Sequence, residues 1–110
     1  PVYTVVAEKL YAMVLLGMTN SRLKDYLDLW ILLDREALDP GILASAIAAT
    51  FNRRGTLLPT ELPIGLSDEF AGDASRQALW AAFLRKNGLK AMPLGDVVDA
   101  LRERLQPALA

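Results

Sequence analysis

The side chains best suited to chemistry lie near the start of the chain and are all charged. Asp25 and Asp28 are one helical turn apart, so in a helix both carboxylates lie on one face, where they could share a cation. Arg22 lies one turn earlier on that face and could neutralise one of them. This spacing favours a local ion pair and a helix-dipole contact over catalysis, because structural ion pairs are the commoner case.

Lys9 stands in the middle of an almost wholly apolar stretch, with Glu8 beside it in sequence but about 100° away around a helix. One interpretation is a lysine that extends its charge to solvent from the edge of the core. The other is a point charge directed at a phosphate or at an acidic residue. Spacing leaves both interpretations open.

These charges lie within residues 5–33, whose pattern predicts two helices joined by a tight polar turn at residues 19–21. We expect helices at residues 4–18 and at about 22–36, with Ser21 as the N-cap of the second. A short turn makes the two helices antiparallel, and their apolar composition predicts that they are buried almost all round. Lys9 is far from the turn and Asp25 close to it, so contact between them is not settled.

The remaining sequence carries helix start and stop signals and no segment with strand periodicity. Helical spacing places Ile42 and Leu79 on inner faces. We expect helices at 41–54 (after Asp39), 74–86 (after Asp73) and from Pro93 to Pro107, a short helical turn at 67–72, and an extended proline-rich crossing segment at 56–66. The sequence therefore predicts a compact all-α domain of about five or six helices, built around an antiparallel helix pair.

Composition narrows the function classes. The 110 residues fit one domain, the net charge is −1, and no long basic run supports nucleic-acid binding. With no Cys and no His, thiol and imidazole chemistry are excluded, and no metal site is predicted. The chain contains no uncharged apolar run of eighteen residues, which a membrane-spanning helix would need. We therefore expect a cytoplasmic protein that does not contact a membrane.

Two other charged groups are best interpreted as helix ends. Arg53 and Arg54, followed by Gly55, place cations at the negative end of a helix, which accounts for them without a nucleic-acid backbone. Asp34 and Glu36 have the spacing of a two-carboxylate metal site, but no strand precedes them, so we interpret them as a solvated helix terminus.

The same stretch resembles a known family. The matching residues are Glu8-Lys9-Leu10, then Asn20-Ser21-Arg22, Lys24-Asp25 and Asp28-Leu29. They are similar to the later motifs of the AbiEii/AbiGii-type nucleotidyltransferase toxins, an E-K-L on one helix and an N-S-R-x-K-D-x-x-D-L on the next. The similarity continues with less specific residues over essentially the whole chain.

The resemblance implies a polymerase-β-like nucleotidyltransferase toxin of a toxin–antitoxin or phage-abortive-infection system. Its helical C-terminal half would supply catalytic Lys9 and Asp25, with Glu8, Arg22, Lys24 and Asp28 binding or orienting the nucleotide. Mg²⁺ and a nucleoside triphosphate would bind the intact enzyme, and neither is expected for this chain alone. The implied partners are an N-terminal nucleotidyltransferase core, an antitoxin, and an acceptor that could be tRNA or protein.

One departure from that family pattern is large. The chain has no Gly-Ser turn followed by a D-x-D pair on a strand, so it lacks the metal-binding core and should be inactive alone. Together with the absence of an initial Met, this predicts that residues 1–110 are one helical domain, the C-terminal portion of a longer enzyme. The alternative is a non-catalytic helical module that uses its excess apolar surface, with 53% hydrophobic residues, to bind a partner or a second copy.

Overall fold

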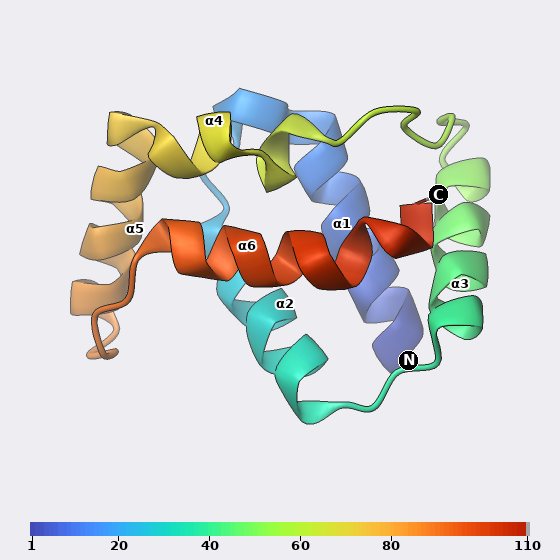
Figure 1. The fold of residues 1–110 in the computed structure, drawn as a ribbon, viewed down its shortest axis with the longest axis horizontal. Coiled ribbons are helices and arrows are strands. Elements are labelled where there is room, and N and C mark those ends of the chain that lie inside the picture. The colour runs from blue at the N-terminus through green and yellow to red at the C-terminus, as the bar shows by residue number, and fades with distance from the viewer. Residues whose placement is uncertain (110) are drawn as a thin grey trace.

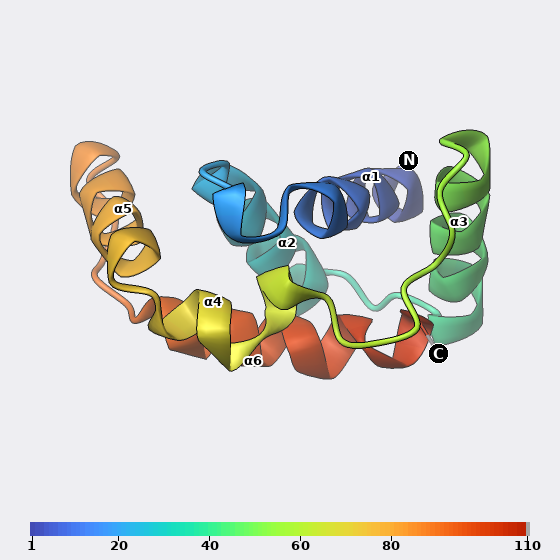
Figure 2. The ribbon, with the colours of Figure 1, turned by 90° about the horizontal axis from the view of Figure 1, so that it is seen from above.

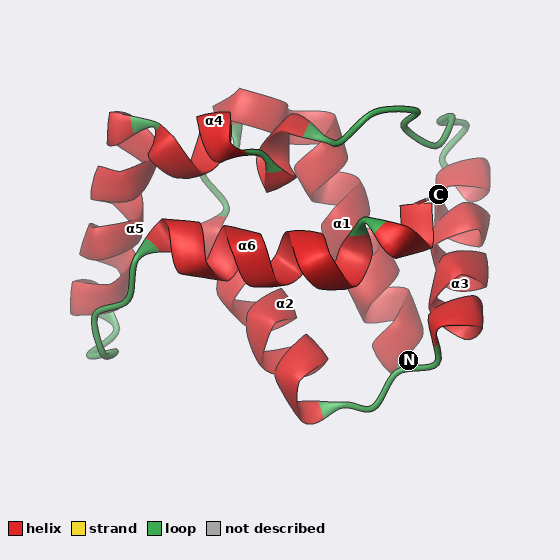
Figure 3. Ribbon diagram, in the orientation of Figure 1, coloured by secondary structure: helices red, strands yellow, loops and turns green. Residues whose placement is uncertain are grey.

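Six α-helices make up the fold in the computed structural model, which describes residues 1–109 (Figure 1). They are α1 (Val2–Leu16), α2 (Leu23–Arg35), α3 (Pro40–Arg53), α4 (Asp68–Gly72), α5 (Ala74–Lys86) and α6 (Leu94–Leu105). Short 3₁₀ turns follow at Gly17–Thr19, Ile64–Leu66 and Pro107–Leu109. The described residues contain no strand (Figure 3), which confirms the predicted all-α class.

The helices form two layers with the core between them. α1 and α2 run in opposite directions in one layer, and α6 crosses beneath both in the other, as the view from above shows (Figure 2). α3 stands beside α1 at one end of the molecule, and α5 lies at the opposite end. Fully buried side chains from both layers meet in the middle, among them Leu10, Met13, Tyr26, Leu29 and Leu101. The antiparallel pair is confirmed, although α1 packs more extensively on α3 than on α2.

Three of the predicted helix starts are confirmed by capping hydrogen bonds. Asp39 Oδ1 accepts from the Ile42 amide at 3.0 Å, and Asp73 Oδ2 accepts from the Arg76 amide at 2.9 Å. Ser67 caps α4 in the same way. These side-chain oxygens satisfy amides that have no partner inside the helix, which is why such residues begin helices.

The start of α2 differs from the prediction. Ser21 does not cap the helix, which begins at Leu23. Arg22 is the N-cap residue and makes no side-chain capping hydrogen bond. The turn before the helix is instead held by Asn20, which is 1% exposed and whose Oδ1 accepts from the Arg22 amide at 2.8 Å. Arg76 of α5 holds the connection from the other side by donating to the carbonyls of Met18 and Asn20. The turn is thus set by a buried amide and a distant arginine, which local sequence patterns do not reveal.

α1 is not buried all round, contrary to the prediction. Val6, Leu10 and Met13 are fully buried, but Val5 is 40% exposed and Leu15 is 64% exposed. A helix that is apolar on every side has more apolar surface than α2, α3 and the layer below can cover. Ile42 and Leu79, expected on inner faces, are likewise 53% and 41% exposed.

Among the described residues, Val2–Thr19 is also the one stretch long and apolar enough, by length and composition, to cross a membrane. A core helix passes that test equally well. Its inner face belongs to the core, and both of its charged residues are ion-paired to neighbouring helices. In this fold one face of the stretch is part of the core and the rest is not, since 28% of its residues are buried.

Gly65 offers a test of the packing beneath the α1–α2 pair. A Cβ added at Gly65 would lie 2.8 Å from the Tyr26 hydroxyl oxygen, which donates to the Gly65 carbonyl at 2.6 Å. We predict that Gly65→Ala lowers the free energy of unfolding by about 1–3 kcal/mol, because the buried ring must shift. Urea denaturation measures this, with Gly95→Ala in α6 as the control, since no atom other than its chain neighbours and its own helix backbone lies within 4 Å of a Cβ there. Equal stability of the two variants would contradict this packing.

Candidate functional site

Lys9 joins α1 to α2 through both predicted aspartates. Its Nζ lies 3.0 Å from Asp25 Oδ1 and 3.0 Å from Asp28 Oδ2, and the side chain is only 22% exposed. The one-turn spacing of the aspartates puts both carboxylates on the face of α2 that meets α1. The contact that the sequence left open is therefore made, and Lys9 is not a free lysine at the edge of the core.

Arg22 and Lys24 bind the same two carboxylates from the solvent side. Arg22 Nη2 lies 3.0 Å from Asp25 Oδ2, but off the hydrogen-bond direction, so that this buried oxygen accepts no hydrogen bond. Lys24 Nζ donates to Asp28 Oδ2 at 2.8 Å. Five of the six predicted site residues thus form one network, which we call the lysine network: Lys9, Arg22, Lys24, Asp25 and Asp28.

Ionisation in the lysine network is set by competition between burial and pairing. Burial alone would lower the pKa of the Lys9 ammonium, but hydrogen bonds to Asp25 and Asp28 outweigh it and raise that pKa. Burial alone would raise the pKa of Asp28, but Lys24 and Lys9 together lower it. Both groups are therefore held in their charged forms.

Glu8, the sixth predicted residue, belongs to a separate network on the other side of α1. Its Oε2 accepts from Arg54 Nη2 at 2.6 Å and its Oε1 from Arg53 Nη2 at 3.3 Å. The hydrogen bond from Arg54 is the main cause that lowers the pKa of Glu8. We call Glu8, Arg53 and Arg54 the arginine network. Glu8 faces α3 while Lys9 faces α2, as their separation around the helix requires.

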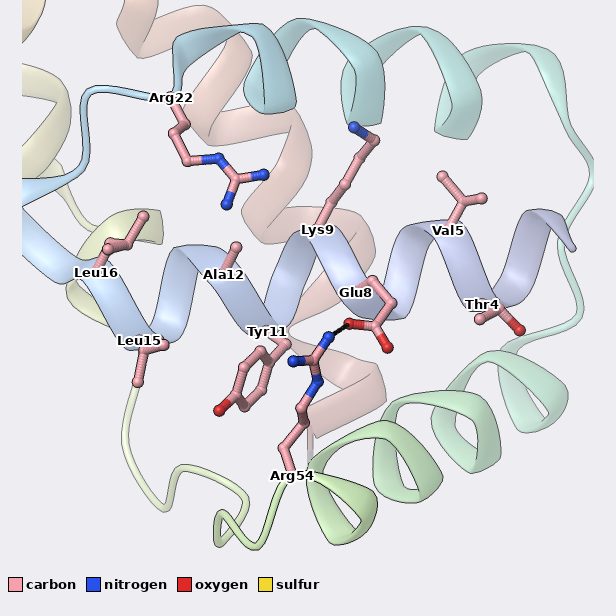
Figure 4. A pocket seen from close by; sticks show the side chains of 10 residues that line it. All are labelled: Thr4, Val5, Glu8, Lys9, Tyr11, Ala12, Leu15, Leu16, Arg22 and Arg54. Carbon is pink, nitrogen blue, oxygen red and sulfur yellow. Dashed lines mark hydrogen bonds and ion pairs between the residues drawn. The ribbon is translucent and has the colours of Figure 1, made fainter.

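A cavity of about 480 Å³ lies over the open face of α1, between the two networks. Figure 4 shows its walls, with Arg22 on one side, Arg54 on the other, and α1 forming the floor. The floor is mostly apolar and includes Ala12, Leu15 and Leu16. The volume is that of a pocket for a small molecule.

Both walls of this cavity carry excess positive charge. The lysine network holds three cations and two carboxylates, and the arginine network holds two cations and one carboxylate. Each network has a net charge of +1, whereas the whole chain has a net charge of −1. The cavity therefore presents a local positive field in an acidic protein, which favours an anionic ligand.

Sequence reasoning did not identify two residues of the cavity, Arg54 and Tyr11. The Arg54 guanidinium carbon lies 5.2 Å from the centroid of the Tyr11 ring, a cation–π distance. Arg54 does lie at the C-terminal end of α3, as the sequence predicts, but its side chain also reaches Glu8 on α1. The sequence signal that could have pointed to Arg54 is Glu8, because a carboxylate on an apolar helix needs a cationic partner from another part of the chain.

The donor set of the described residues does not fit a metal ion. No group of three or more acidic or other metal-ligating residues is found in the part of the chain that the structure describes. The two aspartates that could bind Mg²⁺ are instead engaged by three cations.

The pKa directions predict how stability depends on pH. Asp28 and Glu8 have folded pKa values below their ordinary 3.8 and 4.5, so their stabilisation is lost as pH falls through the folded values. Lys9 has a folded pKa above 10.5, so its contribution is present below 10.5 and lost as pH rises through the folded value.

We predict that the difference in free energy of unfolding between the wild type and Lys9→Met is largest at neutral pH. It should shrink as pH falls below 3.8 and as pH rises above 10.5, because the ion pairs are lost in the wild type at both extremes. Urea denaturation across the pH range measures this difference. A difference that stays constant with pH would show that Lys9 is not ion-paired.

Comparison with known proteins supports the family that the charged motifs resemble. Residues 1–106 match the family model described as "Nucleotidyl transferase AbiEii toxin, Type IV TA system". No curated protein and no solved structure matches the chain. Because the family model spans nearly the whole sequence, the chain belongs to the AbiEii family of nucleotidyltransferase toxins of type IV toxin–antitoxin systems.

Proposed function

We propose that this chain forms the helical wall of the nucleotide site in a nucleotidyltransferase toxin. Lys9 and Arg22 face the phosphates of a nucleoside triphosphate in the cavity over α1, and Asp25 holds both cations in place. The single observation that carries this proposal is the cavity itself, a small-molecule pocket with a cationic wall on each side. Membership of the AbiEii family supplies the reaction class.

Lys9 is suited to this task because its position is fixed. Two aspartates on α2 hold the ammonium, so a flexible side chain loses little further freedom when a ligand arrives. A cation held in advance near a transferring phosphoryl group offsets the charge that develops there. Asp25 is 8% exposed and contacts both Lys9 and Arg22, so it positions the two groups that would touch phosphate.

Lys24 and Asp28 support the same arrangement one turn along α2. Asp28 shares Lys9 with Asp25, and Lys24, whose side chain is 73% exposed, balances the second carboxylate. Lys24 adds a second cation beside Asp28, which further offsets the repulsion between the two aspartates one helical turn apart. We therefore assign these two residues to orienting Lys9.

The complete reaction needs groups that the described residues do not provide. Nucleotide transfer uses Mg²⁺, but the aspartates here are engaged by cations. We therefore derive no step through a metal ion from this chain. We propose that a nucleotidyltransferase core of the same protein closes the open side of the cavity. The exposed apolar residues Val5 and Leu15 beside it support such a contact. The family further supports an antitoxin as partner.

We predict that Lys9→Ala or Asp25→Ala, made in the protein expressed from its complete natural reading frame, reduces nucleotide transfer by at least about a hundredfold. The assay follows incorporation of label from α-³²P nucleoside triphosphates into acceptor RNA or protein. Lys90→Ala is the matched control, since Lys90 is exposed and lies outside the cavity. Circular dichroism and thermal denaturation establish that each variant is folded.

Turnover at the wild-type rate by a folded Lys9 variant would contradict the assignment. Absence of transfer by the wild type, across all four nucleotides and both acceptor classes, would favour the non-catalytic alternative. In that case the apolar face around Leu15, 64% exposed, would be a docking surface for a partner or a second copy.

A further inference from the structure

The wall of the cavity opposite Lys9 is formed by Arg54 and Tyr11. We propose that Arg54 is a second phosphate-binding residue of the cavity, and that Glu8 is its exchangeable counter-ion, displaced when a ligand phosphate binds. This inference rests on the proposed function, because it takes the ligand to be a nucleoside polyphosphate. It assigns Glu8 a part opposite to that of a binding residue, since Glu8 competes with the ligand.

Arg54 is held on a fixed aromatic platform. Its guanidinium lies over the Tyr11 ring, whose hydroxyl is 3.2 Å from Thr56 Oγ1. The Tyr11 ring also packs edge-to-face with Phe51, with the ring centroids 5.2 Å apart. Phe51 is 1% exposed, so the platform is anchored in the core. A guanidinium that is positioned in advance loses little freedom on binding, which favours bidentate recognition of phosphate.

Glu8 is bound in a way that permits exchange. Its side chain is 32% exposed and that of Arg54 is 51% exposed, and ion pairs between such accessible groups contribute little to stability. A polyphosphate carries more charge than one carboxylate and forms stronger charge-assisted hydrogen bonds with a guanidinium. It therefore competes well for Arg54.

Arg53 gives the displaced carboxylate a remaining partner. It lies 3.3 Å from Glu8 Oε1, and it also donates to Thr50 Oγ1 at 3.2 Å, outside the cavity. When Glu8 leaves Arg54 it stays paired with Arg53, so no charge is left without a partner. The two adjacent arginines thus have different roles: Arg54 binds the ligand phosphate, and Arg53 remains paired with Glu8.

The separation of the two cationic walls indicates the class of ligand. Arg22 and Lys9 stand on the side of α2, Arg54 stands on the side of α3, and apolar Ala12 lies on the floor between them (Figure 4). A single phosphate can engage only one wall. A chain of several phosphates can neutralise both, and the cavity of about 480 Å³ has room for it. The site therefore selects polyphosphates over monophosphates.

The test is a calorimetric titration of the 110-residue chain with inorganic tripolyphosphate and, separately, with inorganic phosphate at low ionic strength. We expect the wild type to bind tripolyphosphate at least about tenfold more tightly than phosphate, and Arg54→Gln to weaken tripolyphosphate binding about tenfold. Glu8→Gln should strengthen binding severalfold, because it removes the competing carboxylate. Arg85→Gln, the matched control with the same charge change, should alter the Kd by less than about threefold, since Arg85 is exposed on α5 and does not line the cavity.

Arg54→Lys keeps the positive charge and guards against misfolding of Arg54→Gln. Its affinity for tripolyphosphate should lie between those of the wild type and Arg54→Gln, because an ammonium cannot bind two phosphate oxygens in the planar manner of a guanidinium. Equal affinity of the wild type, Arg54→Lys and Arg54→Gln, or weaker binding by Glu8→Gln, would overturn the inference. So would a wild type that binds neither anion.

Lys9→Met separates this inference from the proposed function. If Lys9→Met weakens tripolyphosphate binding and Arg54→Gln does not, the second phosphate contact is wrong and the proposed nucleotide site stands. If neither variant changes the affinity, both are wrong.

Discussion

The arrangement of this domain depends on how one lysine is accommodated between two helices. Lys9 lies at the α1–α2 contact and meets Asp25 and Asp28 at 3.0 Å each. Removing charges from water is costly, and a partly buried ion pair often recovers no more than that cost. We therefore expect its main consequence to be specificity, because a shift of α1 along α2 would move the ammonium away from the two carboxylates. That register also places Arg22 beside the cavity.

α1 serves both the core and the candidate site. Its inner face contributes fully buried residues such as Leu10 and Met13, which fix the helix in place. Its outer face is apolar and open, and the two ion networks stand on either side of it. A rigid helical floor suits a binding site, because Lys9 projects from that helix and is held by two ion pairs, and Arg22 and Arg54 lie directly at the ends of α2 and α3. The same open face accounts for part of the apolar excess of the chain, and other exposed apolar residues, such as Leu57 at 92%, lie elsewhere.

The sequence was sufficient to predict the helices, but not all of the contacts between them. Capping side chains such as Asp39 and Asp73 act within one turn, so their parts follow from local pattern. The one-turn spacing of Asp25 and Asp28 predicted a shared face, and the structure shows that Lys9 is the cation they share. Family resemblance pointed to the same residues, and the family itself is confirmed. The assignment of these residues to catalysis stays a prediction.

What the sequence did not show depends on long-range geometry. The link between Glu8 and Arg54 joins residues far apart in the chain, and it arises from the way α3 packs along α1. The helix-end interpretation of Arg54 was adequate locally, so nothing required a second explanation. In the same way Asn20 and Arg76, not Ser21, set the α1–α2 connection. Buried polar groups are hydrogen-bonded in the folded protein, often to residues far away in the sequence. Patterns within one or two helical turns do not reveal those partners.

The central claim is that Lys9 and Asp25 act as one unit across the α1–α2 contact. A double-mutant cycle tests it most directly, with unfolding free energies for the wild type, Lys9→Met, Asp25→Asn and the double variant. Both side chains are largely buried, so the pair should be coupled by about 1 kcal/mol or more, and the double variant should be more stable than the sum of the single effects implies. Additive effects would contradict the account, because they would mean that Lys9 and Asp25 do not interact in the folded protein.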